Sequence, residues 1–170
     1  MIDLLTEVGT QMTIEKTNVY SEAWKTIRDF LKANLTDPIN NTTNSSRKWV
    51  YNREPKPGAN FYGLPFIQVS DLTIPEEGKT FGTGIYLHKL RAVITIKCEE
   101  RRNVNEGQTH QLDSLSNELN LAVKTQSSMT SAGIKNIKIT DVGTEDSEFR
   151  ENPVRVRTFT MEADLPVAYA

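Results

Sequence analysis

Few residues of the sequence have the types and spacing that could support catalysis. The chain has two histidines, His88 and His110, and one cysteine, Cys98. It contains no H-E-x-x-H motif, no Gly-x-Ser-x-Gly motif and no cysteine pair at zinc-ligand spacing. Cys98 alternates with isoleucines in an apolar row, so we expect a small core residue rather than a nucleophile. The sequence therefore predicts no catalytic residue, no cofactor and no metal site.

Two other patterns resemble chemical sites without meeting their requirements. The tripeptide GKT at Gly78–Thr80 has the ending of a phosphate-binding loop, but residue 73 is a threonine where that loop needs a glycine. The carboxylate pairs Glu76–Glu77 and Glu99–Glu100 lie in or beside polar loops. We expect these carboxylates to be solvated charges.

The segment NPVRVRTFTMEADLPV, at 152–167, carries two arginines in an unusual place. It alternates like a β-strand, but its apolar residues are at even positions in the first half and at odd positions from Phe159. Arg155 and Arg157 therefore occupy the row that later faces the core. One explanation is a β-bulge near 157–158, or an edge-strand position, which would leave both arginines facing solvent.

Two segments show the three-and-four spacing of apolar residues that is typical of amphipathic helices. The first spans 18–35, with Thr17 or Asn18 as its cap and the dipeptide Asp37-Pro38 beyond its end. The second spans 109–125 and has leucines on one face. Each helix is expected to cover a sheet with its apolar face.

Strand patterns fill most of the remaining regular sequence. Five strands are predicted, at 47–52, 66–72, 85–100, 134–143 and 152–167. The order helix, three strands, helix, two strands predicts the α+β class, a two-layer structure with a mostly antiparallel or mixed sheet of about five strands packed against two helices. We expect a single domain over 1–170, with 1–16 as an N-terminal extension.

Polar loops separate these elements and carry several aromatic side chains. The predicted loops are 36–46, 52–64, 71–84 and 144–152. Four aromatic residues lie in or beside them: Tyr51, Phe61, Tyr62 and Phe81. They are candidates for subunit contacts, because interfaces favour aromatic residues and arginine. Alternatively, they pin the loops to the body of the protein. Trp24 and Trp49 are predicted core residues.

Charge and composition argue against several classes of protein. The chain of 170 residues has 20 basic and 22 acidic residues, whereas a dedicated nucleic-acid binder usually has a basic excess. One cysteine excludes an internal disulfide and fits assembly in a reducing compartment. No apolar stretch approaches the length of a membrane span, and the start lacks a signal-peptide pattern. We expect a chain made in the cytosol without membrane contact.

Three sequence features together resemble a known family. They are the early helix VYSEAWKTIRDFLKANL before a Pro-bearing loop, the strand LPFIQV after a Pro/Gly loop, and the long strand followed by the helix HQLDSLSNELNLAVKT and two final strands. In these features the chain resembles the tail terminator (tail completion) proteins of long-tailed bacteriophages and related neck or head-tail joining proteins. The resemblance covers most of the chain, and the N-terminal extension and larger loops depart from it.

The resemblance implies a structural virion protein that acts as a ring, commonly a hexamer. Such a ring caps the tail tube, stops its polymerisation and provides a docking surface for the head. The implied partners are further copies of the chain, the tail tube protein and a head-completion or connector protein. DNA would pass through the lumen with non-specific contact, and the ring would belong to the virion after assembly in the host cytoplasm. Arg155 and Arg157 would then face a subunit interface or the lumen.

Two alternatives remain at the level of sequence. The first is a head-closure or neck connector protein of the same particle, because both are small ring-forming proteins. The second, from a different class, is a small α+β ligand-binding or enzymatic domain. That alternative predicts a pocket that gathers His88 or His110 with carboxylates, and activity as a monomer or dimer.

Overall fold

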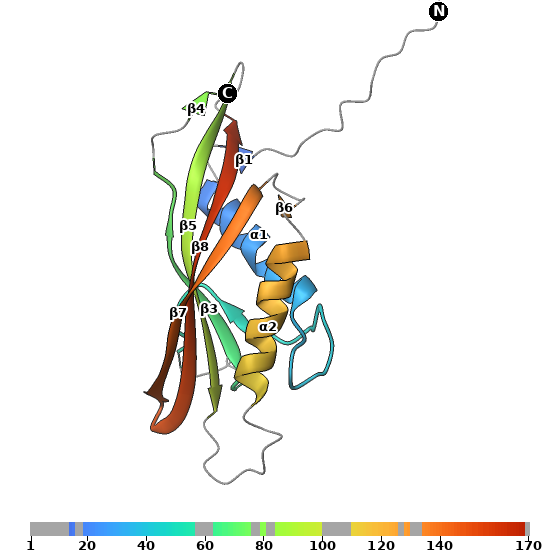
Figure 1. Ribbon diagram of the computed structural model, residues 1–170, viewed down its shortest axis with the longest axis vertical. Helices are drawn as coiled ribbons and strands as arrows, with labels where there is room; N and C mark the ends of the chain where they lie inside the picture. Colours follow the sequence, from blue (N-terminus) through green and yellow to red (C-terminus); the bar gives the residue numbers. More distant parts are fainter. Residues whose placement is uncertain are drawn as a thin grey trace, which may run out of the picture.

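The computed structural model describes residues 14–15, 19–56, 63–75, 79–80, 84–99, 110–125, 128–129 and 134–168. Within these ranges, two helices and one sheet make up the regular structure (Figure 1). The elements are β1 (Ile14–Glu15), α1 (Val19–Asn34), β2 (Val50–Tyr51), β3 (Phe66–Thr73), β4 (Lys79–Thr80), β5 (Ile85–Glu99), α2 (His110–Thr125), β6 (Ser128–Met129), β7 (Ile134–Phe149) and β8 (Asn152–Ala168). The predicted helices and the five predicted strands are all present.

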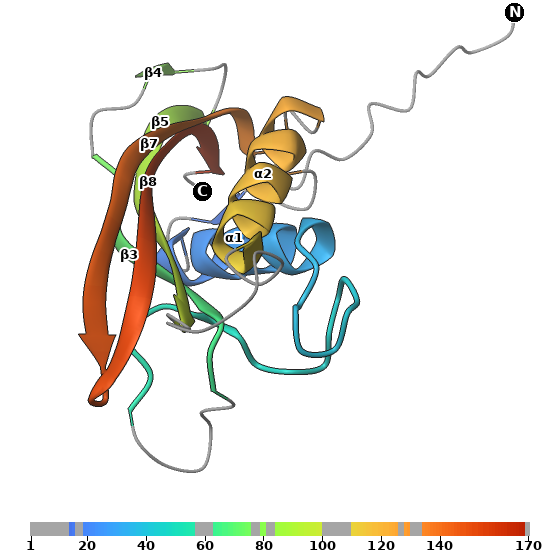
Figure 2. The same ribbon diagram turned by 60° about the horizontal axis from the view of Figure 1, so that its bottom comes forward.

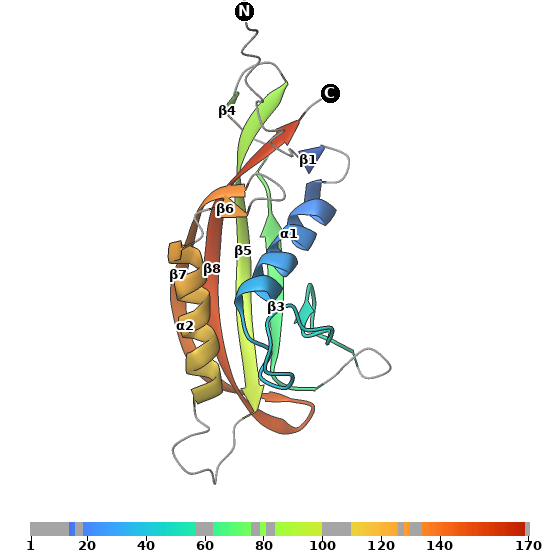
Figure 3. The ribbon, with the colours of Figure 1, turned by 90° about the vertical axis from the view of Figure 1, so that its right-hand side faces the viewer.

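The sheet is mixed, and its strand order is β2-β3-β5-β8-β7-β6. Its centre is the antiparallel pair β5–β8, whose register is unbroken from Ile85 opposite Ala168 to Glu99 opposite Val154. Two short strands pair in parallel, β2 with β3 and β1 with the end of β8 (Figure 3). The predicted α+β class, with a mixed sheet and two helices, is confirmed.

Helix α1 forms because its apolar residues recur on one face while polar residues occupy the other. Ala23, Ile27 and Leu31 are fully buried against the sheet. Lys25 pairs with Glu22 on the exposed side, with 2.8 Å between Nζ and Oε1. Both helices lie on the same side of the curved sheet (Figure 2).

Helix α2 is also amphipathic, with one apolar and one polar face. Its buried face is formed by Leu112, Leu115, Leu119 and Ala122. One hydrogen bond ties the two helices together at the end of α1. The backbone N–H of Thr36 donates to Oε2 of Glu118 at 2.6 Å. The helical layer is therefore joined by a charge-assisted bond as well as by packing.

The main core lies between the helices and the sheet face that they cover. Leu90, Ala92, Ile94, Ile96 and Cys98 of β5 all contribute to it, so the prediction of a buried Cys98 is confirmed. Trp49 is also fully buried, as predicted. Trp24 is only partly buried and packs at the margin of this core. No helix in the described part of the chain is long and apolar enough to cross a membrane.

The bulge predicted near 157–158 is wrong, because β8 keeps an uninterrupted register with β5. The edge-strand alternative is also wrong, since β8 lies between β5 and β7. Instead, the sheet is covered on opposite faces at its two ends. Phe159 and the odd-numbered residues after it join the main core, whereas Val154 and Val156 are buried on the other face.

A second, smaller apolar group occupies that other face, which points away from the helices. This outer cluster consists of Tyr51, Phe66, Phe149, Val154 and Val156. The segment after β2 covers it: Arg150 donates through Nη2 to the Pro55 carbonyl at 3.0 Å, and Lys97 pairs with Glu54 at 3.3 Å. Two cores on opposite faces explain the change of apolar row within a single regular strand.

Strand β7 is longer than predicted. The acidic stretch from Thr144 to Phe149, predicted to be a loop, continues the strand beside β8. Arg150 and Glu151 form the two-residue connection to β8, both with positive φ, 50° and 65°. The register shift expected in β8 lies in β7 instead, where Val142 is an extra residue between Asp141 and Gly143.

Candidate functional site

Arg157 joins three elements through its guanidinium group. Its Nε donates to Oδ2 of Asp141 on β7 at 3.0 Å, and its Nη1 lies 3.3 Å from Oδ1 of Asp113 on α2. The guanidinium carbon is 5.8 Å from the centre of the Phe159 ring. The hydrogen bond from Arg157 lowers the pKa of Asp141 and outweighs the effect of burial. Arg157 therefore fixes the β7–β8 hairpin to the helical layer.

Arg155 lies two residues earlier on the same face but is held more loosely. Its Nε is 3.3 Å from Oδ1 of Asp146, and the side chains of both residues are largely exposed, at 48% and 68%. An exposed pair of this kind contributes little to stability. Both sequence-predicted arginines thus sit on the helix-side face of the hairpin, each with a carboxylate of β7.

Tyr51 is buried within its own chain, with 6% of its surface exposed. Its ring packs edge-on against Phe66 at 5.7 Å between centroids, and its hydroxyl donates to the Lys48 carbonyl at 2.8 Å. The outer cluster already covers the ring within the chain. The buried ring favours the alternative explanation, in which Tyr51 anchors the chain after β2 to the sheet.

The other three aromatic candidates, Phe61, Tyr62 and Phe81, lie outside the described residues. The structure therefore does not bring them together with Tyr51 or with the arginines. Of the two histidines, His88 is buried, and its Nδ1 lies 2.8 Å from the Pro75 carbonyl. The side chain of His110 is outside the described part.

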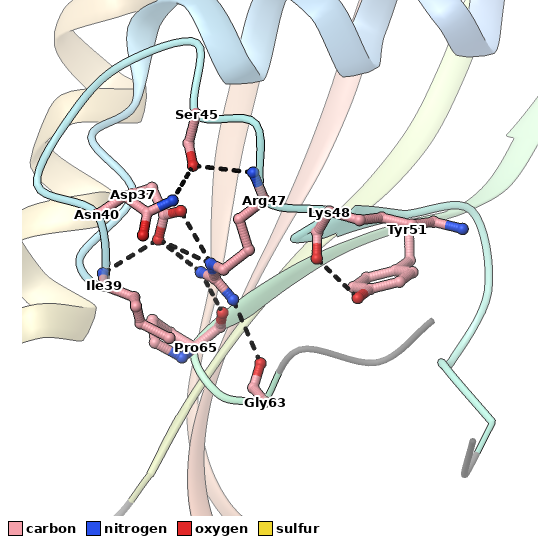
Figure 4. A network of polar contacts seen from close by, with 9 residues as sticks. All are labelled: Asp37, Ile39, Asn40, Ser45, Arg47, Lys48, Tyr51, Gly63 and Pro65. Carbon is pink, nitrogen blue, oxygen red and sulfur yellow. Dashed lines mark hydrogen bonds and ion pairs between the residues drawn. The ribbon is translucent and has the colours of Figure 1, made fainter. Parts of the chain in front are cut away.

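Sequence analysis missed a buried ion pair between Asp37 and Arg47 (Figure 4). Asp37 is fully buried and Arg47 is 7% exposed. Arg47 Nε lies 2.8 Å from Oδ2, and Nη2 lies 2.6 Å from Oδ1 of the same carboxylate. Burial raises the pKa of Asp37, but the bonds from Arg47 and Ser45 outweigh it and leave that pKa lowered.

This ion pair holds two loop segments together. Arg47 Nη2 also donates to the Pro65 carbonyl at 3.0 Å, and Ser45 Oγ accepts the Arg47 backbone N–H at 3.1 Å (Figure 4). The segment between α1 and β2 is thereby fixed against the start of β3. The sequence gives only a weak signal for this ion pair, because Asp37 precedes a proline and is predicted to end the first helix.

A groove of about 470 Å³ opens where α2, β5, β7 and β8 meet. Two acids and two lysines line it, Asp164 and Glu162 with Lys89 and Lys138. Lys89 pairs with Asp164, and Asn136 Nδ2 donates to the same carboxylate at 2.7 Å. These charges are largely matched within the groove. Among the described residues, no group of three side chains could hold a metal ion.

The outer edge of β7 is the most extended polar surface of the hairpin. Every residue from Thr140 to Glu148 is exposed, and β6 pairs only with Ile134 and Lys135. The hairpin reaches past the start of α2 (Figures 1 and 3). Within the described ranges, a long row of backbone N–H and C=O groups along β7 therefore has no neighbouring strand.

Comparison of the chain with protein-family models and with curated proteins gives no match. Two surfaces of the described structure are candidates for a functional role. They are the ion-paired hairpin with its open edge and the charged groove beside it.

Proposed function

We propose that the chain is a structural protein of a phage-like particle, the tail terminator. Copies of the chain form a ring on the last ring of the tail tube. The ring stops further polymerisation of the tube and leaves a surface on which the head docks. Support for this proposal comes from the family resemblance of the sequence and from the shape of the β7–β8 hairpin.

The observation that carries the proposal is the projecting hairpin with an open strand edge. A ring subunit must present rigid surfaces to its neighbours, and an unpaired strand edge is a ready template for contact with another chain. Arg157 joins the hairpin to α2 through Asp113. Arg155, which is half exposed, is the arginine available to a neighbour or to DNA in the lumen.

The mechanism is geometric rather than chemical. Each subunit contributes moderate contacts, and closure of the ring satisfies all of them at once. Rigid loops support this arrangement, because the pair of Asp37 and Arg47 fixes the segment that carries Ile39, which is 53% exposed. An apolar side chain on a fixed loop suits contact with a tube subunit or a head connector.

Two rival functions have their own supporting features. A head-closure or neck connector protein would use the same hairpin in a different ring of the particle. A ligand-binding domain would use the groove lined by Lys89 and Asp164, which has the volume of a small-molecule site. The groove is open and its charges are largely matched, so a ring function is better supported than ligand binding.

The test uses the full chain and its cognate tail tube. Light scattering gives the mass of the protein by itself and after it is mixed with the tubes. The mixture is also imaged by negative-stain electron microscopy. We expect caps at one end of the tubes and tubes that no longer elongate. A protein that leaves the tubes bare and their growth unchanged would exclude the terminator. Binding to isolated heads instead would favour the neck connector.

A further inference from the structure

The two edges of the sheet differ in how available they are for strand pairing. On the β3 side, β2 covers Ile67 and Gln68, and the register with β5 shifts between Ser70 and Thr73. Asp71 within that shift has a φ of 50°, so the strand bends there. Short neighbouring strands protect an edge from pairing. The β7 edge has register shifts of its own, between Lys135 and Lys138 and between Asp141 and Gly143, but it is longer and is uncovered beyond Lys135 over the described residues.

The charges of β7 are divided between its two halves. Lysines occupy the first half, at Lys135 and Lys138, whereas the carboxylates begin with Asp141 at the end of that half and continue through the second half. Two of these carboxylates, Asp141 and Asp146, are already paired with the arginines of β8. Glu145 and Glu148 remain as the acidic groups of the second half that form no ion pair within the described chain.

Register with β8 places Lys138 and Glu145 on the same face of the sheet. Lys138 lies opposite Glu162 and Glu145 lies opposite Val156, and both partners are at even positions of the regular strand β8. Val142 lies between them, is 63% exposed and is the extra residue of the bulge. The edge therefore has a basic half, an apolar centre and an acidic half.

We propose that the β7 edge is a pairing surface for a second copy of this chain, in antiparallel orientation about a two-fold axis near Val142. Antiparallel pairing places Lys138 of each copy beside Glu145 of the other, and the contact occurs twice by symmetry. The axis then passes between Asp141 and Val142, so Val142 of each copy lies opposite Asp141 of the other. Parallel pairing would instead place lysine against lysine and glutamate against glutamate, which is unfavourable.

This inference goes beyond the proposed function and does not depend on it. A two-fold contact joins two copies but does not close a ring, because a ring needs two different surfaces on each subunit. The dimer is therefore a form of the free chain, in which the open edge is covered before the chain meets a larger assembly. Covering the edge also prevents open-ended association through it.

The test is a charge swap measured in the absence of tail tubes. Sedimentation equilibrium gives the dimer Kd of the wild type, K138E, E145K and the double variant K138E/E145K. Each single change creates two like-charge contacts per dimer, so we expect Kd to rise about tenfold or more. The double variant restores both contacts with reversed polarity, so its Kd returns to within about threefold of the wild type. Lys124→Glu, an exposed change on α2, is the matched control and leaves Kd unchanged.

Two outcomes would overturn the inference. One is a wild-type chain that stays monomeric at the highest soluble concentration. The other is a dimer whose Kd is the same in the wild type and in all three charge variants of the edge, since its contact would then lie elsewhere. Far-UV circular dichroism verifies that each variant is folded. Tube capping is measured on the same samples: capping by a monomeric chain rejects this dimer alone, and a dimer that never caps rejects the terminator alone.

Discussion

Arg157 and Arg155 differ in what surrounds them, although they occupy neighbouring positions in one row. Arg157 contacts Asp141, Asp113 and the Phe159 ring, whereas Arg155 contacts only Asp146 among the ion pairs described. We predict that Arg157→Ala lowers the free energy of unfolding by about 1 kcal/mol, a value reduced by the exposure of its partners. Arg155→Ala changes it by less than about 0.5 kcal/mol. Urea unfolding of both variants measures the difference, and equal effects would contradict it.

The buried pair of Asp37 and Arg47 should be the most sensitive polar contact of the described structure. Asp37→Asn leaves the Arg47 charge buried without its counter-ion, so we predict a loss of about 3–5 kcal/mol in the free energy of unfolding at neutral pH. Asp29→Asn is the control, because the Asp29 ion pair with Arg28 is exposed. Its effect should stay within about 0.5 kcal/mol.

The pair also has a defined pH dependence. The folded pKa of Asp37 is lowered below that of an unfolded aspartate, which is about 3.9. Its contribution to stability is therefore present above that value and is lost as pH falls through the lower folded pKa. Asp37→Asn should reduce the slope of unfolding free energy against pH below about 4. An unchanged slope would show that other carboxylates, such as Asp141 and Asp164, dominate acid unfolding.

Cys98 is predicted to be unreactive in the folded protein. It is 4% exposed, and burial raises the pKa of its thiol to about 12. The thiolate, which is the reactive form, is therefore scarce at neutral or mildly alkaline pH. A chromogenic disulfide reagent should label one thiol per chain in denaturant and leave the native protein unlabelled for hours. Rapid labelling without denaturant would mean that β5 opens locally.

At the scale of elements, β8 buries opposite faces along its length, and the face that carries the outer cluster can be tested by itself. Val156→Ala removes two methyl groups from the outer cluster, so we predict a loss of about 1–3 kcal/mol in unfolding free energy. Thr160→Ala, on the same strand face but exposed, should cost less than about 0.5 kcal/mol. Equal small effects in urea unfolding would show that the outer cluster contributes little to stability.

The sequence predicted the elements well because their patterns are local. Both helices and the strand β5 follow from spacing of apolar residues within one segment. The extent of β7 could not be predicted in this way, because its acidic stretch is stabilised by cross-strand partners such as Arg155 and Arg157. For the same reason, the change of apolar row in β8 suggested a bulge. Only the tertiary structure reveals that a second core covers the opposite face.

The candidate site was predictable only in part. Arg155 and Arg157 stood out in the sequence because charged residues occupied an apolar row. Asp37 and Arg47 gave no comparable signal, since an ion pair between two loop residues depends on how the chain returns on itself. The open edge of β7 was equally invisible, because the strand order of a sheet is set by long-range pairing.

At the scale of the whole molecule, both helices share one main core with the sheet, so helices and strands should unfold together. Trp49 lies in the main core, and Trp24 lies at its margin, so tryptophan fluorescence reports on the helix side of the sheet. We predict that urea transitions followed by fluorescence and by far-UV circular dichroism coincide. The measurement is made at one fixed protein concentration, because association would shift the midpoint. Separate transitions would mean that the hairpin unfolds independently.

The position of β8 in the sheet has a consequence for synthesis of the chain on the ribosome. β8 follows every other strand in chain order, yet it lies between β5 and β7 at the middle of the sheet. Until residues 152–168 have left the exit tunnel, β5 lacks its main neighbour and β7 has nothing to pair with along most of its length. The sheet of the nascent protein is therefore incomplete until β8 is added. A ribosome stalled before β8 would leave β5 and β7 without their central partner and accessible to chaperones.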